Sequence, residues 1–296
     1  MTTIAFIGLG NMGGPMAANL VKAGRKVMGF DLAQASCDAA RADGVTIAAS
    51  ATYAVKGADV VITMLTEGRH VVSVWTEILP DVAKGALMID CSTIDVASAV
   101  AAHKLAAAKG IASVDAPVSG GTGGAKGATL TFMAGGAADA FAKARPELEN
   151  MGKKIGHCGE AGAGQAAKIC NNMILGISMI GVSEAFVLAE KLGLSHQALF
   201  DVASTSSGQC WSLTTYCPVP GPVPASPANN GYKPGFAAAL MLKDLRLSQE
   251  ASKAAGAQTP LGEHAADIYA AFEKAGHGGD DFSGIINHLR GIGPSS

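Results

Sequence analysis

Residues 4–13 read Ile4-Ala5-Phe6-Ile7-Gly8-Leu9-Gly10-Asn11-Met12-Gly13, and this stretch decides the fold of the first part of the chain. It joins a short apolar run to a helix-compatible segment that starts at Pro15. Between a strand and a helix, the first glycine of G-x-G-x-x-G makes a tight turn, the second lets the backbone approach a pyrophosphate, and the third allows close packing. The helix N-terminus then faces the anion. The stretch predicts a dinucleotide-binding turn.

An acidic residue follows at the expected distance. Asp31 ends the second predicted strand, and the fingerprint places such an acid about 20 residues beyond the glycines. Its carboxylate can accept hydrogen bonds from both ribose hydroxyls of NAD, whereas it would repel the 2′-phosphate of NADP. The next three residues, 32–34, include no arginine that could hold that phosphate. The sequence therefore predicts NAD, and an ordinary tight turn with a solvated aspartate is the alternative.

The segments around this unit alternate between short apolar runs and longer amphipathic ones, which indicates βαβ units and a mainly parallel sheet. The predicted strands are Ile4–Gly8, Lys26–Asp31, Asp59–Leu65, Ala86–Cys91, Ala112–Ala116, Thr129–Gly135 and Lys154–Cys158. Strand-like runs disappear after Gly164, and Gln165–Leu192 is expected to be one long apolar helix. We therefore predict two domains, residues 1–162 and residues 163–296.

The second predicted domain is helical apart from one segment. Further helices are expected at Ser195–Ser204, Ala237–Ala255, Leu261–Lys274 and Phe282–Leu289. Residues 217–234 contain six prolines, which exclude a regular helix or a sheet ladder. A connection of this length in a compact protein is usually functional or mobile.

Composition excludes several classes of protein. Of the 296 residues, 49% are hydrophobic and 16% are charged, and the net charge is −2, so neither disorder nor nucleic-acid binding is indicated. The six cysteines form no C-x-x-C pair and the seven histidines show no metal spacing, so no metal site is expected. The most apolar run, 173–188, is shorter than a membrane span, and no targeting leader is seen. The expected compartment is the cytoplasm, with mostly buried free thiols.

Two further motifs carry candidate chemistry. Asp115-Ala116-Pro117-Val118-Ser119-Gly120-Gly121 ends a predicted strand and opens a glycine-rich loop that runs to Gly127. Successive amides in such a loop, with the Ser119 hydroxyl, can hold a small carboxylate, although a flexible surface turn has the same composition. Lys168 and Asn172 are four residues apart and share one face of the long apolar helix. A charged residue in such a helix needs a partner or a cleft, so the pair is a candidate for substrate contact.

With these motifs, the sequence resembles the β-hydroxyacid dehydrogenases over essentially its whole length. The similarity lies in Gly8–Gly13 with Pro15-Met16-Ala17, Asp115–Gly121, Gly164–Lys168 with Asn171-Asn172, and Lys243-Asp244-Leu245. Cys210-Trp211, Pro218–Gly221 and Tyr232–Phe236 resemble the branch that acts on 3-hydroxyisobutyrate. One departure is Ala128, where the family usually has glycine.

The resemblance implies an α/β fold: a Rossmann-type doubly wound domain followed by an all-α domain of the 6-phosphogluconate dehydrogenase C-terminal type, with the active site between them. It implies that Lys168 is catalytic and that Asn172 assists it. Substrate-binding residues would be Ser119, Gly120, Gly121, Lys243, Asp244, Trp211 and Phe236, although core packing explains the two aromatic residues equally well. Cofactor-binding residues would be Gly8, Leu9, Gly10, Asn11, Met12, Gly13, Asp31, Met64, Leu65, Ser92, Thr93 and Lys243.

The implied reaction is NAD-dependent oxidation of 3-hydroxyisobutyrate to methylmalonate semialdehyde, a step of valine catabolism. Lys168 would take the hydroxyl proton, and burial beside cationic NAD⁺ and Lys243 is expected to lower its pKa from about 10.4. Alternatives are the reduction of tartronate semialdehyde or succinic semialdehyde, and a non-catalytic dinucleotide-binding module. The apolar helical half also predicts a homo-oligomer, a dimer or a tetramer.

Overall fold

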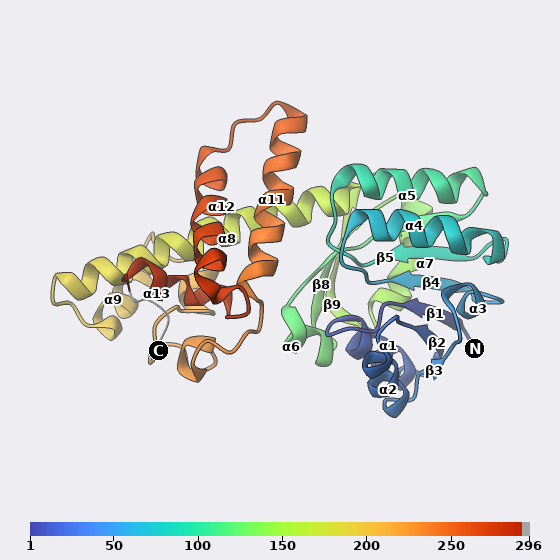
Figure 1. The fold of residues 1–296 in the computed structure, drawn as a ribbon, viewed down its shortest axis with the longest axis horizontal. Coiled ribbons are helices and arrows are strands. Elements are labelled where there is room, and N and C mark those ends of the chain that lie inside the picture. Colours follow the sequence, from blue (N-terminus) through green and yellow to red (C-terminus); the bar gives the residue numbers. More distant parts are fainter. Residues whose placement is uncertain (292–296) are drawn as a thin grey trace. The chain divides into compact units, whose positions relative to one another are not determined.

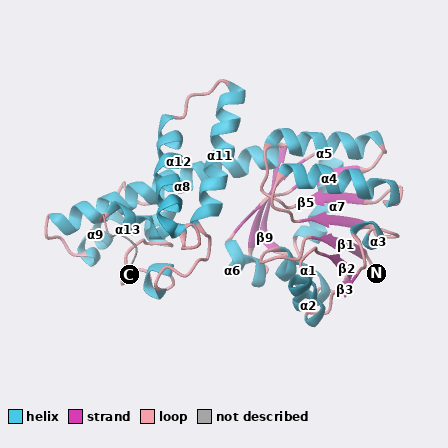
Figure 2. Ribbon diagram, in the orientation of Figure 1, coloured by secondary structure: helices cyan, strands magenta, loops and turns pink. Residues whose placement is uncertain are grey.

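The computed structural model describes residues 1–291, and the chain divides into two compact units, Met1–Lys168 and Ile169–Ser296. All strands of residues 1–291 belong to the first unit, and the described part of the second consists of helices and loops (Figure 2). Helix α8 (Ala163–Lys191) starts at the predicted domain boundary and continues past Lys168 into the second unit. The predicted order of an α/β domain and an all-α domain is confirmed.

The sheet of the first unit has the strand order of a dinucleotide-binding domain. Its order is β3-β2-β1-β4-β5-β6-β8-β7, with β9 also paired to β8, and the first six strands are parallel. This run follows the Rossmann order 3-2-1-4-5-6. The strands are β1 (Thr3–Ile7), β2 (Lys26–Phe30), β3 (Thr46–Ile47), β4 (Val60–Thr63), β5 (Leu87–Asp90), β6 (Ala112–Asp115), β7 (Val118–Ser119), β8 (Leu130–Gly135) and β9 (Gly152–Gly159). The sequence did not predict β3 or β7, because two residues are too few to show a period.

Helices cover both faces of this sheet (Figure 1). Alternate residues of β1 show the division, since Ile4 and Phe6 pack in one core cluster and Ala5 and Ile7 in another. The first cluster includes residues of α1 (Gly13–Lys22), α2 (Gln34–Ala42), α6 (Gly121–Lys126) and α7 (Ala138–Leu148). The second includes residues of α3 (Ala51–Ala54), α4 (Gly68–Ile78), the short η1 (Leu79–Asp81) and α5 (Val96–Ala108). The two faces confirm the doubly wound fold.

The second unit packs its helices around α8. Met179 of α8, Met241 and Leu245 of α11, and Tyr269 of α12 are fully buried in one cluster. The elements after α8 are α9 (His196–Ala203), α10 (Trp211–Thr214), η2 (Pro227–Asn230), α11 (Ala238–Ala255), α12 (Pro260–Phe272), η3 (Glu273–His277), η4 (Phe282–Gly284) and α13 (Ile285–Leu289). The four predicted helices are present with ends shifted by a few residues, whereas the short α10, η2 and η3 were not predicted.

The proline-rich segment 217–234 folds into a compact loop. Cys217 and Val219 are fully buried, and the hydroxyl of Tyr232 donates to the Pro218 carbonyl at 2.9 Å. The Ser226 hydroxyl donates to the Cys217 carbonyl at 2.5 Å. Apart from one short helical turn, the segment lacks regular structure, as its prolines require.

Helix α8 alone among the helices of residues 1–291 has the length and apolar composition of a membrane span. The core helices of globular proteins meet the same criterion, and α8 buries polar side chains such as Asn172 and Ser183 along its length. The apolar run 173–188, too short for a membrane span, is interpreted from the sequence as a buried helix. That interpretation is wrong in part, because Ile174 and Leu188 are 66% and 59% exposed. One side of α8 therefore presents apolar side chains on the surface.

Candidate active site

The Gly8–Gly13 turn has the geometry that its three glycines predicted. Gly8 has φ of +96°, and a Cβ there would lie 2.2 Å from the Met64 carbonyl oxygen. A Cβ at Gly13 would lie 1.9 Å from the Gly8 carbonyl oxygen, whereas a Cβ at Gly10 would meet no atom within 4 Å. Helix α1 has neither a side-chain cap nor an acidic residue in its first turn. The turn thus leaves open backbone surface at Gly10 beside a helix N-terminus, which fits a pyrophosphate.

Asp31 lies at the carboxyl end of β2 and is held by backbone amides. One carboxylate oxygen accepts from Leu9 N at 2.6 Å, and the other accepts from Ala33 N at 2.8 Å. The bond to Leu9 links the acid directly to the glycine-rich turn, 22 residues earlier. Asp31 is half-buried and Leu32 beside it is 95% exposed, so the carboxylate lies at the surface where a ribose can approach.

A buried hydrogen-bond network supports the residues predicted to flank the nicotinamide. Ser92 donates its hydroxyl to Asp90 at 2.6 Å and accepts from Leu65 N at 2.7 Å. Thr63 donates to the same Asp90 oxygen at 2.7 Å. The other oxygen of Asp90 is buried and has no hydrogen-bond partner among residues 1–291, and burial raises the pKa of this carboxyl to about 6. Asp90 was not predicted; its place at the end of β5 was the available signal.

The Ser119–Gly121 segment differs from the expected loop. Ser119 ends β7 and Gly120 has φ of +133°, but residues 121–126 form the short helix α6 instead of a glycine-rich loop. The positive φ values of Gly120 and Gly121 turn the chain sharply out of the strand, and the Gly124 amide then donates to the Gly120 carbonyl at 3.0 Å. The position where Ala128 replaces the family's glycine has φ of +51°, which disfavours a residue with a Cβ.

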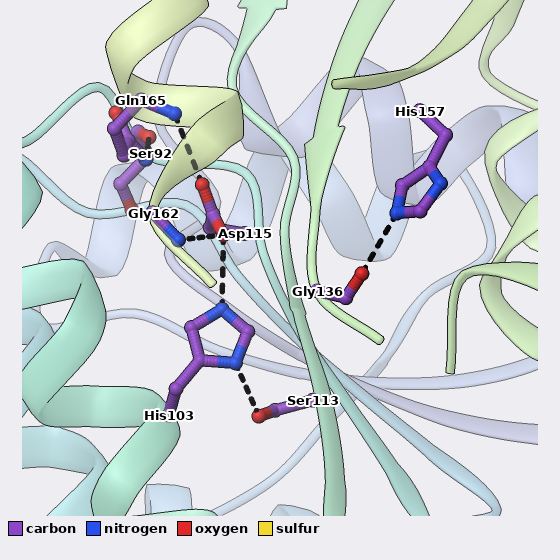
Figure 3. A network of polar contacts seen from close by, with 8 residues as sticks. All are labelled: Ser92, His103, Ser113, Asp115, Gly136, His157, Gly162 and Gln165. Atoms are coloured by element: carbon purple, nitrogen blue, oxygen red, sulfur yellow. Dashed lines mark hydrogen bonds and ion pairs between the residues drawn. The ribbon is translucent and has the colours of Figure 1, made fainter. Parts of the chain in front are cut away.

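The first turn of α8 is joined to the ends of β5 and β6 (Figure 3). Asp115 accepts from Gly162 N at 2.8 Å and from Gln165 N at 3.0 Å. The Gln165 side chain donates to the Ser92 carbonyl at 2.7 Å. His103 Nε2 lies 2.9 Å from the same carboxylate. Asp115 and Gln165 belong to the sequence motifs, but the sequence predicts no role for either. Their contacts show that they hold the first turn of α8 against the ends of β5 and β6.

Lys168 and Asn172 lie one turn apart on α8, as their spacing predicted, and both are buried, with 6% and 1% exposed. The structure also brings Asn172 together with a second predicted residue. Its side-chain amide donates to the carboxylate of Asp244 in α11, which is 3% exposed. Lys243, the neighbour of Asp244, is half-buried. Within the second unit, one predicted substrate-binding residue, Asp244, thus contacts the predicted assisting residue Asn172.

The two predicted aromatic residues belong to one row of stacked rings. Trp211 stacks on Tyr216 with centroids 4.9 Å apart, and Tyr216 stacks on Phe282 at 5.2 Å. Phe236 meets Phe282 edge-on at 5.7 Å. Asp281 is fully buried and accepts from Tyr216 and from the Phe236 amide, which fixes the row. Phe236 is partly buried and packs against the core cluster, whereas Trp211 is 49% exposed at the end of the row.

No three His, Cys, Asp or Glu side chains gather in a metal-binding group anywhere in residues 1–291. The residues that the structure provides fit a nicotinamide dinucleotide instead, through the open backbone at Gly10 and the carboxylate at Asp31. A nicotinamide cofactor, when bound, supplies hydride transfer.

Comparison with known proteins identifies the family. Residues 3–159 match the NAD binding domain of 6-phosphogluconate dehydrogenase, and residues 162–289 match the domain described as NAD-binding of NADP-dependent 3-hydroxyisobutyrate dehydrogenase. A solved structure of Mycobacterium tuberculosis 3-hydroxyisobutyrate dehydrogenase with L-serine is 57% identical, covers 98% of this chain and 99% of that chain, and has a TM-score of 0.95. The chain belongs to the 3-hydroxyisobutyrate dehydrogenase family.

Other members of this family and its neighbours share the full length of the chain. The 3-hydroxyisobutyrate dehydrogenase of Pseudomonas aeruginosa is 50% identical over 98% of this chain and 99% of its own. A protein of the same organism named NAD-dependent L-serine dehydrogenase is 48% identical over 96% of both chains. The predictions of an NAD-dependent oxidoreductase and of NAD as its cofactor are confirmed. A non-catalytic dinucleotide-binding module is correspondingly disfavoured.

Proposed function

We propose that the protein oxidises 3-hydroxyisobutyrate to methylmalonate semialdehyde with NAD⁺, a step of valine catabolism. The observation that carries the proposal is the 57% identity, over 98% of the chain, to a 3-hydroxyisobutyrate dehydrogenase. The buried lysine and asparagine one turn apart on α8 support it, because a lysine and an amide on one face of a helix can together hold a hydroxyl group and move its proton. Cofactor contacts are proposed for residues 8–13, Asp31, Met64, Leu65, Ser92, Thr93 and Lys243.

The proposed chemistry removes a hydride from the carbinol carbon and a proton from its hydroxyl. NAD⁺, when bound, accepts the hydride. Lys168, as the neutral amine, takes the hydroxyl proton and becomes an ammonium ion while the carbinol C–O bond becomes a carbonyl. In the reverse direction the ammonium returns that proton to the oxygen. Asn172, whose amide is oriented by Asp244, holds the hydroxyl oxygen during the transfer.

The substrate carboxylate is proposed to bind at residues 119–121. The Ser119 hydroxyl and the backbone amides after it offer hydrogen-bond donors next to the positive φ turn of Gly120 and Gly121. Lys243 would add a positive charge, and Trp211 and Phe236 an apolar wall for the substrate methyl group. An apolar wall favours a methyl substituent over a charged one, because an ammonium group on that wall would lose its hydration.

L-Serine is the second candidate substrate, because one relative is named for it and one related structure was solved with it. L-Serine carries an ammonium group where 3-hydroxyisobutyrate carries a methyl group, and both are β-hydroxy acids. The same lysine chemistry serves both. The distinction therefore depends on the surroundings of the substituent at C2.

Initial rates of NAD⁺ reduction test the proposal, with (S)-3-hydroxyisobutyrate, L-serine, D-glycerate and 4-hydroxybutyrate as substrates. We expect the highest kcat/KM for 3-hydroxyisobutyrate and a loss of about 10³-fold or more in Lys168→Ala. A preference for D-glycerate or 4-hydroxybutyrate would instead point to tartronate semialdehyde or succinic semialdehyde as the physiological partner. Lys168→Ala with the wild-type rate would refute the role of the lysine.

Selection of NAD over NADP is proposed to depend on Asp31. In Asp31→Ser, the kcat/KM ratio of NAD⁺ to NADP⁺ should fall at least about tenfold, because the carboxylate that repels a 2′-phosphate is gone. Asp38→Asn is the matched control, since it removes an exposed carboxylate on α2 that pairs with Arg41 and does not contact the turn. An unchanged ratio in Asp31→Ser would contradict the assignment.

A homo-oligomer, a dimer or a tetramer, is also proposed. The exposed side of α8 carries Ile174, Leu188 and the adjoining Leu192, which are 66%, 59% and 75% exposed. A second copy that covered them would remove apolar surface from water. Light scattering should give a multiple of 29.6 kDa, and Leu188→Arg should lower that mass. A strictly monomeric wild-type protein would contradict this.

We also propose a cytoplasmic location, because the six free cysteines fit a reducing compartment.

A further inference from the structure

Gln165 is a buried polar residue without a role in the chemistry above. Its side chain is fully buried, donates to the Ser92 carbonyl at 2.7 Å, and accepts from Ile94 N at 3.1 Å. The two hydrogen-bonded groups lie on either side of Thr93 in the chain. A single side-chain amide therefore holds the backbone of the loop after β5 both before and after that residue. Both polar groups of the side chain are thereby used within the protein, and Figure 3 shows Gln165 beside Ser92.

The backbone of the same helical turn is held from β6. Asp115 is 2% exposed, and its two carboxylate oxygens accept from the amides of Gly162 and Gln165 at 2.8 and 3.0 Å. The first amides of a helix are usually satisfied by a cap immediately before it, whereas this cap comes from 47 and 50 residues upstream. At Gly164, a Cβ would lie 2.3 Å from the Met133 carbonyl oxygen, so only glycine allows the start of α8 to lie this close to β8.

Lys168 follows Gln165 by three residues, so the two side chains share a face of α8 and are separated by about 4.5 Å along its axis. Gln165 grips the segment 92–94, which includes two of the proposed nicotinamide-flanking residues. The height and rotation of the helix at Lys168 are thus set by the same contacts that hold Ser92 and Thr93. A small rotation of α8 would displace the lysine from the hydroxyl that it must deprotonate.

We propose that Gln165 is a positioning residue, which fixes Lys168 relative to the Ser92–Thr93 segment through its two hydrogen bonds, with Asp115 capping the helix behind it. This inference rests on the proposed role of Lys168. Gln165 does not touch the reacting atoms. Its contribution to the rate passes through the lysine alone.

A double-mutant cycle tests this inference. Gln165→Met keeps the length of the side chain but cannot form either hydrogen bond, and we expect it to lower kcat by about 10- to 100-fold while NADH still binds. In a Lys168→Ala background, measured with high enzyme concentration, the same substitution should change the residual rate by no more than about twofold, because no lysine is left to misplace. If the methionine variant folds poorly, Gln165→Glu takes its place in the cycle. The glutamate keeps the acceptor for Ile94 N but loses the donor to the Ser92 carbonyl, and we expect the same changes in kcat in both backgrounds.

Arg25→Met is the matched control for a general loss of stability. Arg25 pairs with the buried Glu147 at 2.8 Å, immediately before β2 and so at the amino edge of the sheet. Its loss should lower thermal stability without changing kcat. Three results would each overturn the positioning role of Gln165. They are an equal fold reduction of the rate by Gln165→Met in the wild-type and Lys168→Ala backgrounds, an unchanged kcat in Gln165→Met, and a loss of NADH binding in that variant. An unchanged rate in Lys168→Ala alone would instead overturn the proposed role of the lysine.

Discussion

Asn172 and Asp244, two buried residues 72 positions apart, are joined by a hydrogen bond from the asparagine amide to the aspartate carboxylate. The oxygen of the same asparagine side chain accepts from the side-chain Nδ2 of Asn171 at 2.9 Å. The carboxylate therefore decides which end of the Asn172 amide faces which neighbour. A residue predicted to assist catalysis is thus oriented by another residue predicted at the site.

Two substitutions of Asp244 distinguish the effect of this hydrogen bond from the effect of the negative charge. Asp244→Leu leaves the buried amide without its acceptor, and we expect a loss of about 1 to 3 kcal/mol in unfolding free energy and a fall in kcat of about tenfold. Asp244→Asn keeps an acceptor oxygen and should lose less of both. Urea titration and steady-state kinetics measure the two effects, with Ser248→Ala as the control on α11. A leucine variant with the wild-type kcat would show that Asn172 needs no orientation.

Gly10 and Gly13 of the turn should respond differently to alanine. At Gly10 an added Cβ meets nothing, so Gly10→Ala should fold with nearly normal stability but bind NADH more weakly, because the methyl group takes the space proposed for the pyrophosphate. Gly13→Ala should be destabilised instead, because its Cβ would lie 1.9 Å from a backbone oxygen. Thermal melting and NADH fluorescence titration separate the two properties. Equal NADH affinity in Gly10→Ala and the wild type would show that the pyrophosphate does not bind at this turn.

Asp90 should make stability fall with rising pH. Its folded pKa is raised from 3.8 to about 6 by burial, so between these values the folded state binds more protons than the unfolded state. The contribution of Asp90 to stability therefore falls from pH 4 to pH 7, and Asp90→Asn, which does not titrate, should gain about 3 kcal/mol relative to the wild type over that range. Denaturant unfolding at several pH values measures the difference. A difference that is independent of pH would show that Asp90 titrates normally.

Ala128 occupies a conformation that suits glycine. Its φ is +51°, so Ala128→Gly should relieve strain and raise the unfolding free energy by about 1 kcal/mol. Ala125→Gly, the same substitution within α6, should lower it by about 1 kcal/mol because glycine is a poor helix former. Thermal melts of the two variants should move in opposite directions. A destabilised Ala128→Gly would mean that the methyl group packs more favourably than the backbone strain costs.

Much of the fold could be predicted because it depends on local periodicity. The alternating apolar runs before Gly164 and the long apolar helix after it predicted an α/β domain followed by helices, and this order is observed. The error in residues 121–126 has a local cause, since composition alone does not distinguish a glycine-rich helix from a loop. Dinucleotide binding was also readable, because the glycines, the strand, the helix and the acid are all close in sequence.

The sequence by itself determined the turn at Gly8–Gly13, the acid at Asp31 and the one-turn spacing of Lys168 and Asn172, because each depends on short-range geometry. Only the tertiary structure decided that Gln165 grips the segment 92–94 and that the buried amide of Asn172 meets Asp244. These partners are far apart in the chain, and neither motif nor spacing encodes a contact between them. They meet because buried polar groups must find hydrogen-bond partners wherever the packed core brings one within reach.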